Sequence, residues 1–315
     1  MEYKNNYAWC VLVMLNDKYA CGAVTVAQSL RNVKTEYPIW CLVAGNVSPE
    51  CKEFLRGAFD AIIDVPIISH AVSKMLSAKQ ERIYSSWIHA SFTKWNIFNP
   101  ALISADKVIL LDADMLFIEN CDDLFQLTAP ALTFSSAWAR PYLETGIINP
   151  YGELCHGALV NQKHICRGLR HSVVGLACMV LARPDKRLFD TIIEILRSAP
   201  IYKHTTISGF DEQLLAQAIL RTNTPVYHIH QSYNWIVGKK NWLLYGEVPK
   251  TQQYYNSKPW QDHPEDTQWE DVKDWWKIAN MYIAANPDTT KWFSLELTKP
   301  LLSSQSTVAS DLQSE

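Results

Sequence analysis

Short apolar runs alternate with amphipathic segments over the first third of the chain. Runs that suit buried strands lie at residues 10–15, 39–44, 61–65 and 108–111. Between the first three of them, residues 23–31 and 50–58 place apolar side chains at helical spacing. This alternation of strand and helix predicts an α/β domain with a mainly parallel sheet flanked by helices.

The second half of the chain continues this pattern less regularly. Residues 177–181 and 225–229 are typical of strands, and residues 212–220 are typical of a helix that begins after Gly209. From 269 to 285, apolar residues at helical spacing predict a helix that caps the domain. We therefore predict three parts: a single catalytic domain over 1–262, a Trp-rich helical extension packed on it over 263–300, and a disordered tail over 301–315.

Composition narrows the class of protein. The 315 residues are 48% hydrophobic, enough for one large core. Lys and Arg number 29 against 32 Asp and Glu, so no basic surplus predicts a nucleic-acid partner. The eight cysteines form no CxxC pair, which favours reduced thiols. The first apolar run is broken at Asn16 and Asp17, so we predict neither a secretory signal nor a membrane span, and a cytoplasmic protein.

The predicted strand 108–111 ends on Asp112-Ala113-Asp114. In extended backbone, residues i and i+2 point to the same side, so the two carboxylates would converge on one cation while Ala113 faces away. Hard oxygen ligands suit Mg²⁺ or Mn²⁺, and such an ion suits a bound diphosphate. The alternative interpretation is an Asp-rich turn or a helix cap. Ligands gather at the carboxyl ends of parallel strands, where this segment lies.

Five ordered motifs over residues 10–260 resemble those of one enzyme family. They are VLVMLNDKYACGAVTVAQSL, FTKWNIF, LLDADMLFIENCDDLF, GFDEQLL and KPW. Together they are similar to the glycogenin-like glycosyltransferases, the retaining GT-A family 8 that includes glycogenin and galactinol synthase. KQERIYSSWIHASFTKW, LFQLTAPAL and GFDEQLL resemble the glycogenin-like proteins of baculoviruses and other large insect DNA viruses.

The resemblance implies a GT-A type fold, with a Rossmann-like mixed, mainly parallel sheet. It also implies a metal-dependent enzyme that moves a hexose, glucose or galactose, from a UDP-sugar to an acceptor hydroxyl with retention of configuration. Mn²⁺ or Mg²⁺ would be the cofactor, a homodimer is a further expectation, and the cytoplasm of a host cell is expected if the protein is viral. The acceptor is open: carbohydrate, protein or polyol.

On the donor side, the resemblance assigns Asp112 and Asp114 to the metal, with Asp112 also reaching the ribose beside Ala113. It assigns Asn16 and Tyr19 to the uracil and ribose, although Leu15 stands where glycogenin has a hydroxyl residue. Asn16 is otherwise only a turn residue.

Two cations in the central segment are assigned to the donor as well. Lys94 matches the lysine that reaches toward the donor, and Arg82 is a candidate for contact with the phosphates. Without the resemblance, an exposed helix lysine and a solvated arginine explain the same residues.

On the sugar side, Asp211, Glu212 and Gln213 correspond to the family's acidic and amide cluster, and either acidic residue aligns with the key carboxylate. The same residues also suit the first turn of a helix. Lys258 of the KPW motif is expected to contact the diphosphate and to help the leaving group.

Two departures from the family pattern stand out. The metal-binding histidine some six residues before Lys258 is absent, which leaves Gln252 or Gln253 as the third ligand. Lys239 and Lys240 stand where glycogenin carries its acceptor tyrosine, so self-glucosylation is not expected. His228 and His230 are interpreted as strand-end residues. Candidates for stacking on an acceptor sugar, or for ordinary core positions, are Trp138, Trp235 and Trp242.

Other functions compete with the transferase. The missing histidine favours a catalytically silent relative that binds nucleotide-sugar or carbohydrate. A viral or host-interaction protein would keep its function after both aspartates were replaced by asparagine. A Rossmann-type NAD enzyme is disfavoured, because no GxGxxG follows the first strand.

Overall fold

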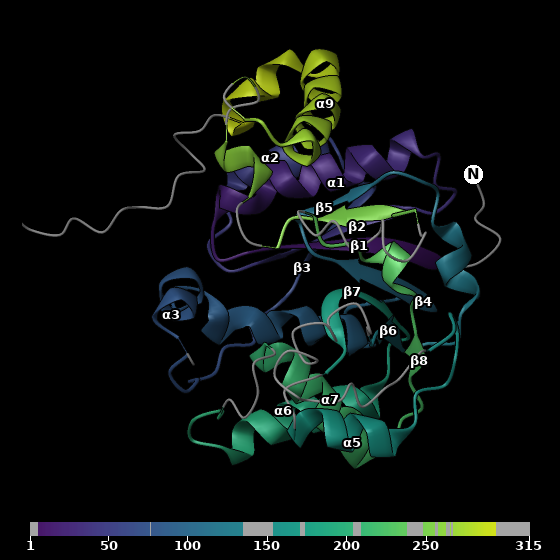
Figure 1. The fold of residues 1–315 in the computed structure, drawn as a ribbon. Coiled ribbons are helices and arrows are strands. Elements are labelled where there is room, and N and C mark those ends of the chain that lie inside the picture. Colours follow the sequence, from purple (N-terminus) through teal and green to yellow (C-terminus); the bar gives the residue numbers. More distant parts are fainter. Residues whose placement is uncertain are drawn as a thin grey trace, which may run out of the picture.

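The computed structural model describes residues 6–75, 77–134, 154–170, 174–203, 209–237, 248–255, 258–262, 265 and 267–293. A seven-stranded sheet runs through the middle of the molecule in the order β3-β2-β1-β4-β7-β6-β8 (Figure 1). Its strands are β1 Tyr7–Met14, β2 Ile39–Ala44, β3 Ala61–Asp64, β4 Lys107–Leu111, β6 Ala131–Thr133, β7 Leu176–Ala182 and β8 Tyr227–His228. A separate two-stranded sheet pairs β5 Met115–Phe117 with β9 Thr251–Gln253.

The strand directions confirm the predicted mixed, mainly parallel sheet. β1 pairs in parallel with β2 and β4, β2 pairs in parallel with β3, and β6 pairs in parallel with β8. β7 runs antiparallel to both of its neighbours, β4 and β6. The carboxyl ends of β1, β2 and β4 therefore lie along one edge of the sheet, and the end of β7 lies at the opposite edge.

Helices cover both faces of the sheet. Figure 1 shows α1 Ala20–Asn32, α2 Pro49–Arg56 and α9 Glu270–Ala285 on one side, and α5 Gln162–Arg170, α6 Lys186–Ser198 and α7 Phe210–Thr222 on the other. Alternate residues of β1 point into two different cores, one on each face of the sheet. Trp9 and Val11 belong to the core under α1 and α9, while Ala8 and Cys10 belong to the core above α6 and α7. Burial on both faces explains why β1 reads as a continuous apolar run.

Five 3₁₀ segments and one short helix lie around these layers. They are η1 Asp17–Tyr19, η2 Ile88–Phe98, η3 Asp122–Gln126, η4 Gln231–Tyr233, η5 Pro259–Gln261 and α3 Ala78–Tyr84. The long 3₁₀ segment η2 is almost wholly buried and packs beside β4, α6 and α7. It carries Lys94 into the interior of the molecule.

α9 and the final 3₁₀ segment η6 Pro287–Phe293 share the core of the first layer rather than forming a separate one. Trp275 is completely buried and its ring lies 5.6 Å from that of Trp260. Trp276 donates from Nε1 to the carbonyl oxygens of Pro259 (3.1 Å) and Asp262 (2.9 Å). α9 therefore fixes the KPW segment in place. The predicted tail, 301–315, lies outside the described residues.

All eight cysteines are free thiols, as predicted. In the parts of the chain that the structure describes, no helix combines the length and the apolar character needed to span a bilayer.

Candidate functional site

The Asp112-Ala113-Asp114 segment lies at the carboxyl end of β4, held on both sides by backbone hydrogen bonds. The Asp112 N–H donates to the carbonyl of Cys178 in β7 (2.9 Å), and the Asp114 carbonyl accepts from the Tyr254 N–H just after β9 (2.9 Å). β4 ends at Leu111, and the backbone then turns into β5. The extended-backbone expectation is therefore wrong, because the chain must turn here to leave one sheet for the other.

Lys94 joins two carboxylates that are far apart in the sequence. Its Nζ lies 2.8 Å from Asp112 Oδ1 and 3.4 Å from Asp211 Oδ2, and its side chain is only 13% exposed. Burial alone lowers the pKa of Lys94, but the Asp112 and Asp211 carboxylates outweigh it and raise that pKa above its usual value. The interpretation of Lys94 as an exposed helix lysine is wrong, because η2 buries it against these carboxylates.

Lys258 forms the second ion pair of the cluster. Its Nζ bonds to Asp114 Oδ2 and also donates to the carbonyl of Tyr254 (2.9 Å). Burial would lower the pKa of Lys258, but Asp114 and Tyr19 raise it overall. Both ammonium groups therefore stay charged, and each neutralises one aspartate of the DxD segment.

A glycine lets the DxD segment and the KPW segment meet over α1. A Cβ added at Gly22 would lie 2.5 Å from the Ala113 carbonyl oxygen and 2.6 Å from the Trp260 ring. Trp260 is 1% exposed and also touches Tyr19 edge-on, with ring centroids 5.5 Å apart. The helix surface at Gly22 thus sets the distance between the two segments that carry Asp114 and Lys258.

The end of β1 contributes Leu15, Asn16 and Tyr19. Leu15 adopts a left-handed backbone (φ 70°), and the exposed Asn16 accepts a hydrogen bond from the Lys18 N–H (3.0 Å), the turn role that any loop asparagine can fill. Burial raises the pKa of Tyr19, and Lys258, Asp114 and Asp112 all act on it electrostatically. Tyr19 therefore faces the cluster.

The two acidic residues at the start of α7 have different surroundings. Asp211 faces Lys94, whereas the Glu212 carboxylate accepts from the N–H groups of Ala177 (3.0 Å) and Gly209 (2.9 Å). Burial and the neighbouring Asp211 raise the pKa of Glu212 to about 7. Gln213 is buried and donates to the Gly209 carbonyl (3.2 Å). Asp211 is thus the acidic residue that joins the cluster, and Glu212 caps the helix.

The two glutamines of β9 point to different environments. Gln252 accepts from the Tyr254 hydroxyl (2.9 Å) and donates weakly to Asp274 of α9 (3.4 Å). Gln253 is 4% exposed, and its Oε1 is buried with no hydrogen-bond partner in the structure. The amide oxygen that remains available is therefore that of Gln253.

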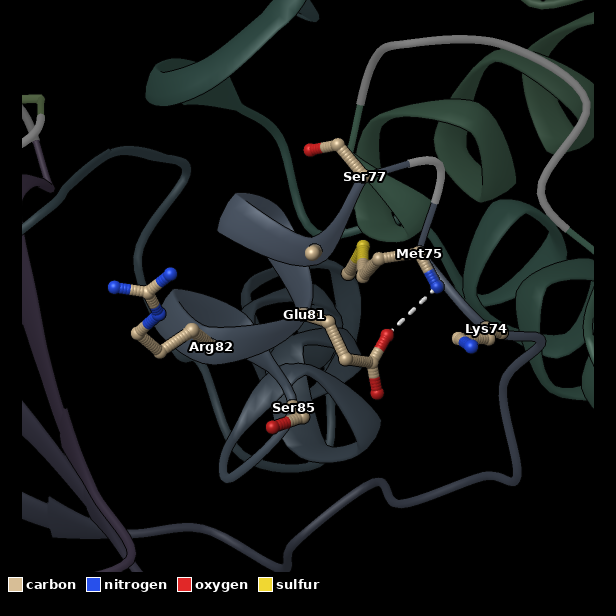
Figure 2. Close-up of a pocket in the computed structure, with 7 residues that line it drawn as sticks. Lys74, Met75, Ser77, Glu81, Arg82 and Ser85 are labelled. Atoms are coloured by element: carbon tan, nitrogen blue, oxygen red, sulfur yellow. Dashed lines mark hydrogen bonds between the residues drawn. The ribbon is translucent and has the colours of Figure 1, made fainter.

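Arg82 is exposed on α3, and its contact with the phosphates stays a prediction. It lines a surface cavity of about 650 Å³ beside α3 with Lys74, Met75 and Glu81. Figure 2 shows the Arg82 side chain extending away from Glu81, whose carboxylate accepts from the Met75 N–H (2.9 Å). The α3 residue that reaches the site is Tyr84, which acts electrostatically on Tyr19.

The remaining residues that the sequence analysis named are three tryptophans, two lysines and two histidines. Trp138, Trp242, Lys239 and Lys240 lie outside the described residues. Trp235 is 7% exposed, so it offers little ring surface to a sugar. His228 is the last residue of β8, and His230 lies two residues later as the cap of η4. Burial, with His230 and His156 close by, lowers the pKa of His228 to about 4.

Sequence reasoning missed Cys178 and Asn234. The Cys178 Sγ lies 3.1 Å from Asn234 Oδ1 and 2.8 Å from Asn234 Nδ2, both groups are buried, and the Cys178 carbonyl holds Asp112. No motif signals this contact, because the two residues lie 56 positions apart.

The cluster suits a divalent cation. Three carboxylates, Asp112, Asp114 and Asp211, face two ammonium groups, so one negative charge is left over. Asp114 Oδ1 and Gln253 Oε1 are both buried and have no hydrogen-bond partner in the structure. These are hard oxygen donors of the kind that Mg²⁺ and Mn²⁺ prefer. Within the described ranges, no three His, Cys, Asp or Glu residues form a metal-binding group. The acidic pair would therefore need an amide or other oxygen ligand.

Residues 10–136 match the model of glycosyl transferase family 8. Human glycogenin-1 is 29% identical over 200 residues, which cover 62% of this chain and 55% of glycogenin-1. The N-terminal part of the chain is thus similar to glycosyl transferase family 8. The uncharacterized protein R707 of Acanthamoeba polyphaga mimivirus is 29% identical over 190 residues, 60% of this chain and 59% of the viral protein.

Solved structures share the fold of this chain. The galactosyltransferase LgtC, in complex with donor and acceptor sugar analogues, has a TM-score of 0.57 and 14% identity, and the match covers 90% of this chain and 99% of LgtC. GlyE of Streptococcus pneumoniae TIGR4 has a TM-score of 0.53 and 16% identity, with 96% and 67% covered. The predicted GT-A type fold is thus confirmed. A viral relative is present, while closeness to baculovirus proteins stays a prediction.

Proposed function

We propose that this protein is a metal-dependent retaining glycosyltransferase that moves a hexose from a UDP-sugar, UDP-glucose or UDP-galactose, to an acceptor hydroxyl. The observation that carries the proposal is the paired cluster in which Lys94 bridges Asp112 and Asp211 while Lys258 holds Asp114. The match of residues 10–136 to glycosyl transferase family 8 supports it. The likeness in fold to LgtC, a galactosyltransferase in complex with donor and acceptor sugar analogues, agrees with this class of reaction.

In this proposal the end of β1 and the DxD segment bind the nucleotide. Tyr19 and Asn16 hold the base and ribose, and Asp112 also reaches the ribose. Lys258 pairs with Asp114, and a diphosphate offers its Nζ a second anion. Lys258 then stabilises the negative charge of the departing UDP.

A bound Mn²⁺ or Mg²⁺ would neutralise the diphosphate and so make UDP a better leaving group. Asp112 and Asp114 would hold it, with Gln253 as the amide ligand because Gln252 is directed toward α9.

On the sugar side, we assign the contact with the transferred hexose to Lys94 and Asp211. Asp211 is the acidic residue that shares Lys94 with Asp112, whereas two backbone N–H groups occupy Glu212. A carboxylate at this position accepts hydrogen bonds from sugar hydroxyls and stabilises positive charge that develops at the anomeric carbon.

The test is UDP release from a panel of UDP-sugars with Mn²⁺, with Mg²⁺ and with EDTA. We expect metal-dependent release from one donor, reduced by roughly a hundredfold or more in Asp112→Asn/Asp114→Asn. Asp64→Asn is the matched control, because Asp64 also ends a strand at this edge but is 72% exposed and pairs with the surface residue Lys52. Equal release by wild type and the double variant would refute the proposal.

One observation favours a second candidate, a silent relative that binds nucleotide-sugar without transferring it. A glutamine stands where the family has its metal-binding histidine. The Gln252 amide bonds to Tyr254 and Asp274 and not to Asp112 or Asp114. This candidate predicts that UDP binds, as measured by calorimetry, while no donor in the panel is consumed.

A further inference from the structure

A second cavity lies at the edge of the sheet opposite the DxD segment. Its volume is about 410 Å³. Residues before β6 and β8, after β7, at the start of α6 and at the end of α7 line it. Because β6 and β8 run in the same direction as β4 and β7 runs against it, these residues all lie at the edge where β4 begins. The cavity is therefore separate from the proposed donor site.

Two arginines give this cavity positive charge without a counter-ion. Arg183 and Arg187 both line it, and neither forms an ion pair with any residue in the described parts of the chain. Asp185 also lines the cavity, but its Oδ1 accepts from the Leu188 N–H (3.0 Å) as the cap of α6. Two cations against one engaged carboxylate leave a net positive charge.

The surroundings add to this positive field. Burial and the nearby Arg183 guanidinium lower the pKa of Lys107, which shows that the two cations repel each other. The Asp185 carboxylate is already engaged as the cap of α6. An anion in the cavity would relieve the repulsion between Lys107 and Arg183.

The remaining wall supplies neutral polar groups and an apolar face. Thr222 and Thr224 share a hydrogen bond (2.6 Å), and Asn223 between them has a left-handed backbone (φ 51°) that ends α7. Ala129, Pro130 and Pro225 form the apolar part. Arginine forks bind phosphate oxygens in pairs, and the volume exceeds what one phosphate group needs.

We propose that the cavity binds the phosphate group of a small phosphate ester, with Arg183 and Arg187 as the phosphate ligands. Thr224 and Asn223 also line the cavity, and we assign them to the rest of the ester. The inference does not depend on the proposed transferase, because its readout is binding at the opposite edge of the sheet.

The test is calorimetric titration at constant ionic strength with three probes: inorganic phosphate, glycerol 3-phosphate and glycerol. We expect the ester to bind at least as tightly as inorganic phosphate, and glycerol not to bind. Arg183→Gln/Arg187→Gln should weaken ester binding by about tenfold or more, because both forks are lost. The donor-site lysines are unchanged in this variant, so phosphate bound there would be unaffected.

Two further variants make the result decisive. Arg167→Gln/Arg170→Gln removes the same charge from α5 and should bind as wild type does. Arg183→Lys/Arg187→Lys keeps the charge but loses the forks, and should bind with intermediate affinity even if the glutamine variant does not fold. The proposal would be overturned by unchanged ester affinity in both cavity variants. It would also be overturned if the control lost as much ester affinity as the cavity variants, or if the protein bound inorganic phosphate but not the ester.

Discussion

Glu212 lies in the interior at the start of α7, where burial and the Asp211 carboxylate raise its pKa to about 7. A raised carboxyl pKa means that the folded state binds a proton that the unfolded state releases. The free energy of unfolding therefore falls as pH rises from about 4.5 to about 7. The proton on Glu212 stabilises the fold only below this window.

Glu212→Gln should remove that pH dependence. We expect the wild type to lose up to about 3 kcal/mol relative to the variant between pH 4.5 and pH 7, whatever the constant difference between them. Denaturant unfolding at a series of pH values measures it. Glu194→Gln, an exposed change on α6, should leave the pH profile as in wild type. Parallel profiles for wild type and Glu212→Gln would contradict the assignment.

Lys94 is the cation shared by Asp112 and Asp211, so its removal leaves two carboxylates without a partner. We expect Lys94→Met to lower the free energy of unfolding by about 3–5 kcal/mol in EDTA. The loss should be larger at high pH than at low pH, because burial raises the pKa of Asp112 and a protonated carboxyl needs no cation. Lys186→Met, which breaks the exposed pair with Asp190, is the control and should cost under about 1 kcal/mol. Equal losses in both variants would disprove the central role of Lys94.

At the scale of elements, α1 positions the DxD and KPW segments through Gly22. Gly22→Ala would place a methyl group 2.5 Å from the Ala113 carbonyl, which must then move. We expect a loss of about 1–3 kcal/mol in stability and weaker UDP binding, measured by denaturation and calorimetry. Gly57→Ala, where the tightest contact is 3.2 Å to the Tyr282 hydroxyl, should leave UDP binding unchanged. Wild-type UDP affinity in Gly22→Ala would show that α1 does not set this spacing.

The sequence pattern predicted the strands that are apolar throughout, but it did not predict the three-residue strands. β2 matches the predicted 39–44, because Pro38 and Gly45 bound an uninterrupted apolar run. β5 and β9 have three residues each, too few for a periodic signal. The antiparallel direction of β7 was also beyond reach, because direction depends on the connection between strands and not on the strand's own residues.

At the scale of the whole molecule, the candidate site is assembled from segments that are distant in sequence. The DxD motif and the KPW motif could be read from the sequence, but their pairing through Lys258 and Asp114 spans 144 residues. The burial of Lys94, and the choice of Asp211 over Glu212 as its partner, follow only from the packing of η2 against α7. Arg82 shows the reverse case, a predicted residue that the fold places on the surface.

The proposed donor site and the arginine-lined cavity lie at opposite edges of the sheet. The proposed donor site lies where β1 and β4 end, and the arginine-lined cavity lies where β4 begins. A ligand in one therefore does not contact a ligand in the other, and any effect between them must pass through the sheet.

The most direct test of the central claim is a proton NMR time course of the UDP-sugar consumed in the panel, with protein and Mn²⁺ and with each sample quenched in EDTA. The account predicts that the anomeric signal of the donor disappears and that the first product signal has the same anomeric configuration. Asp112→Asn/Asp114→Asn should leave the donor intact over the same period. A first product of inverted configuration, or a donor that wild-type protein leaves unchanged, would contradict the account.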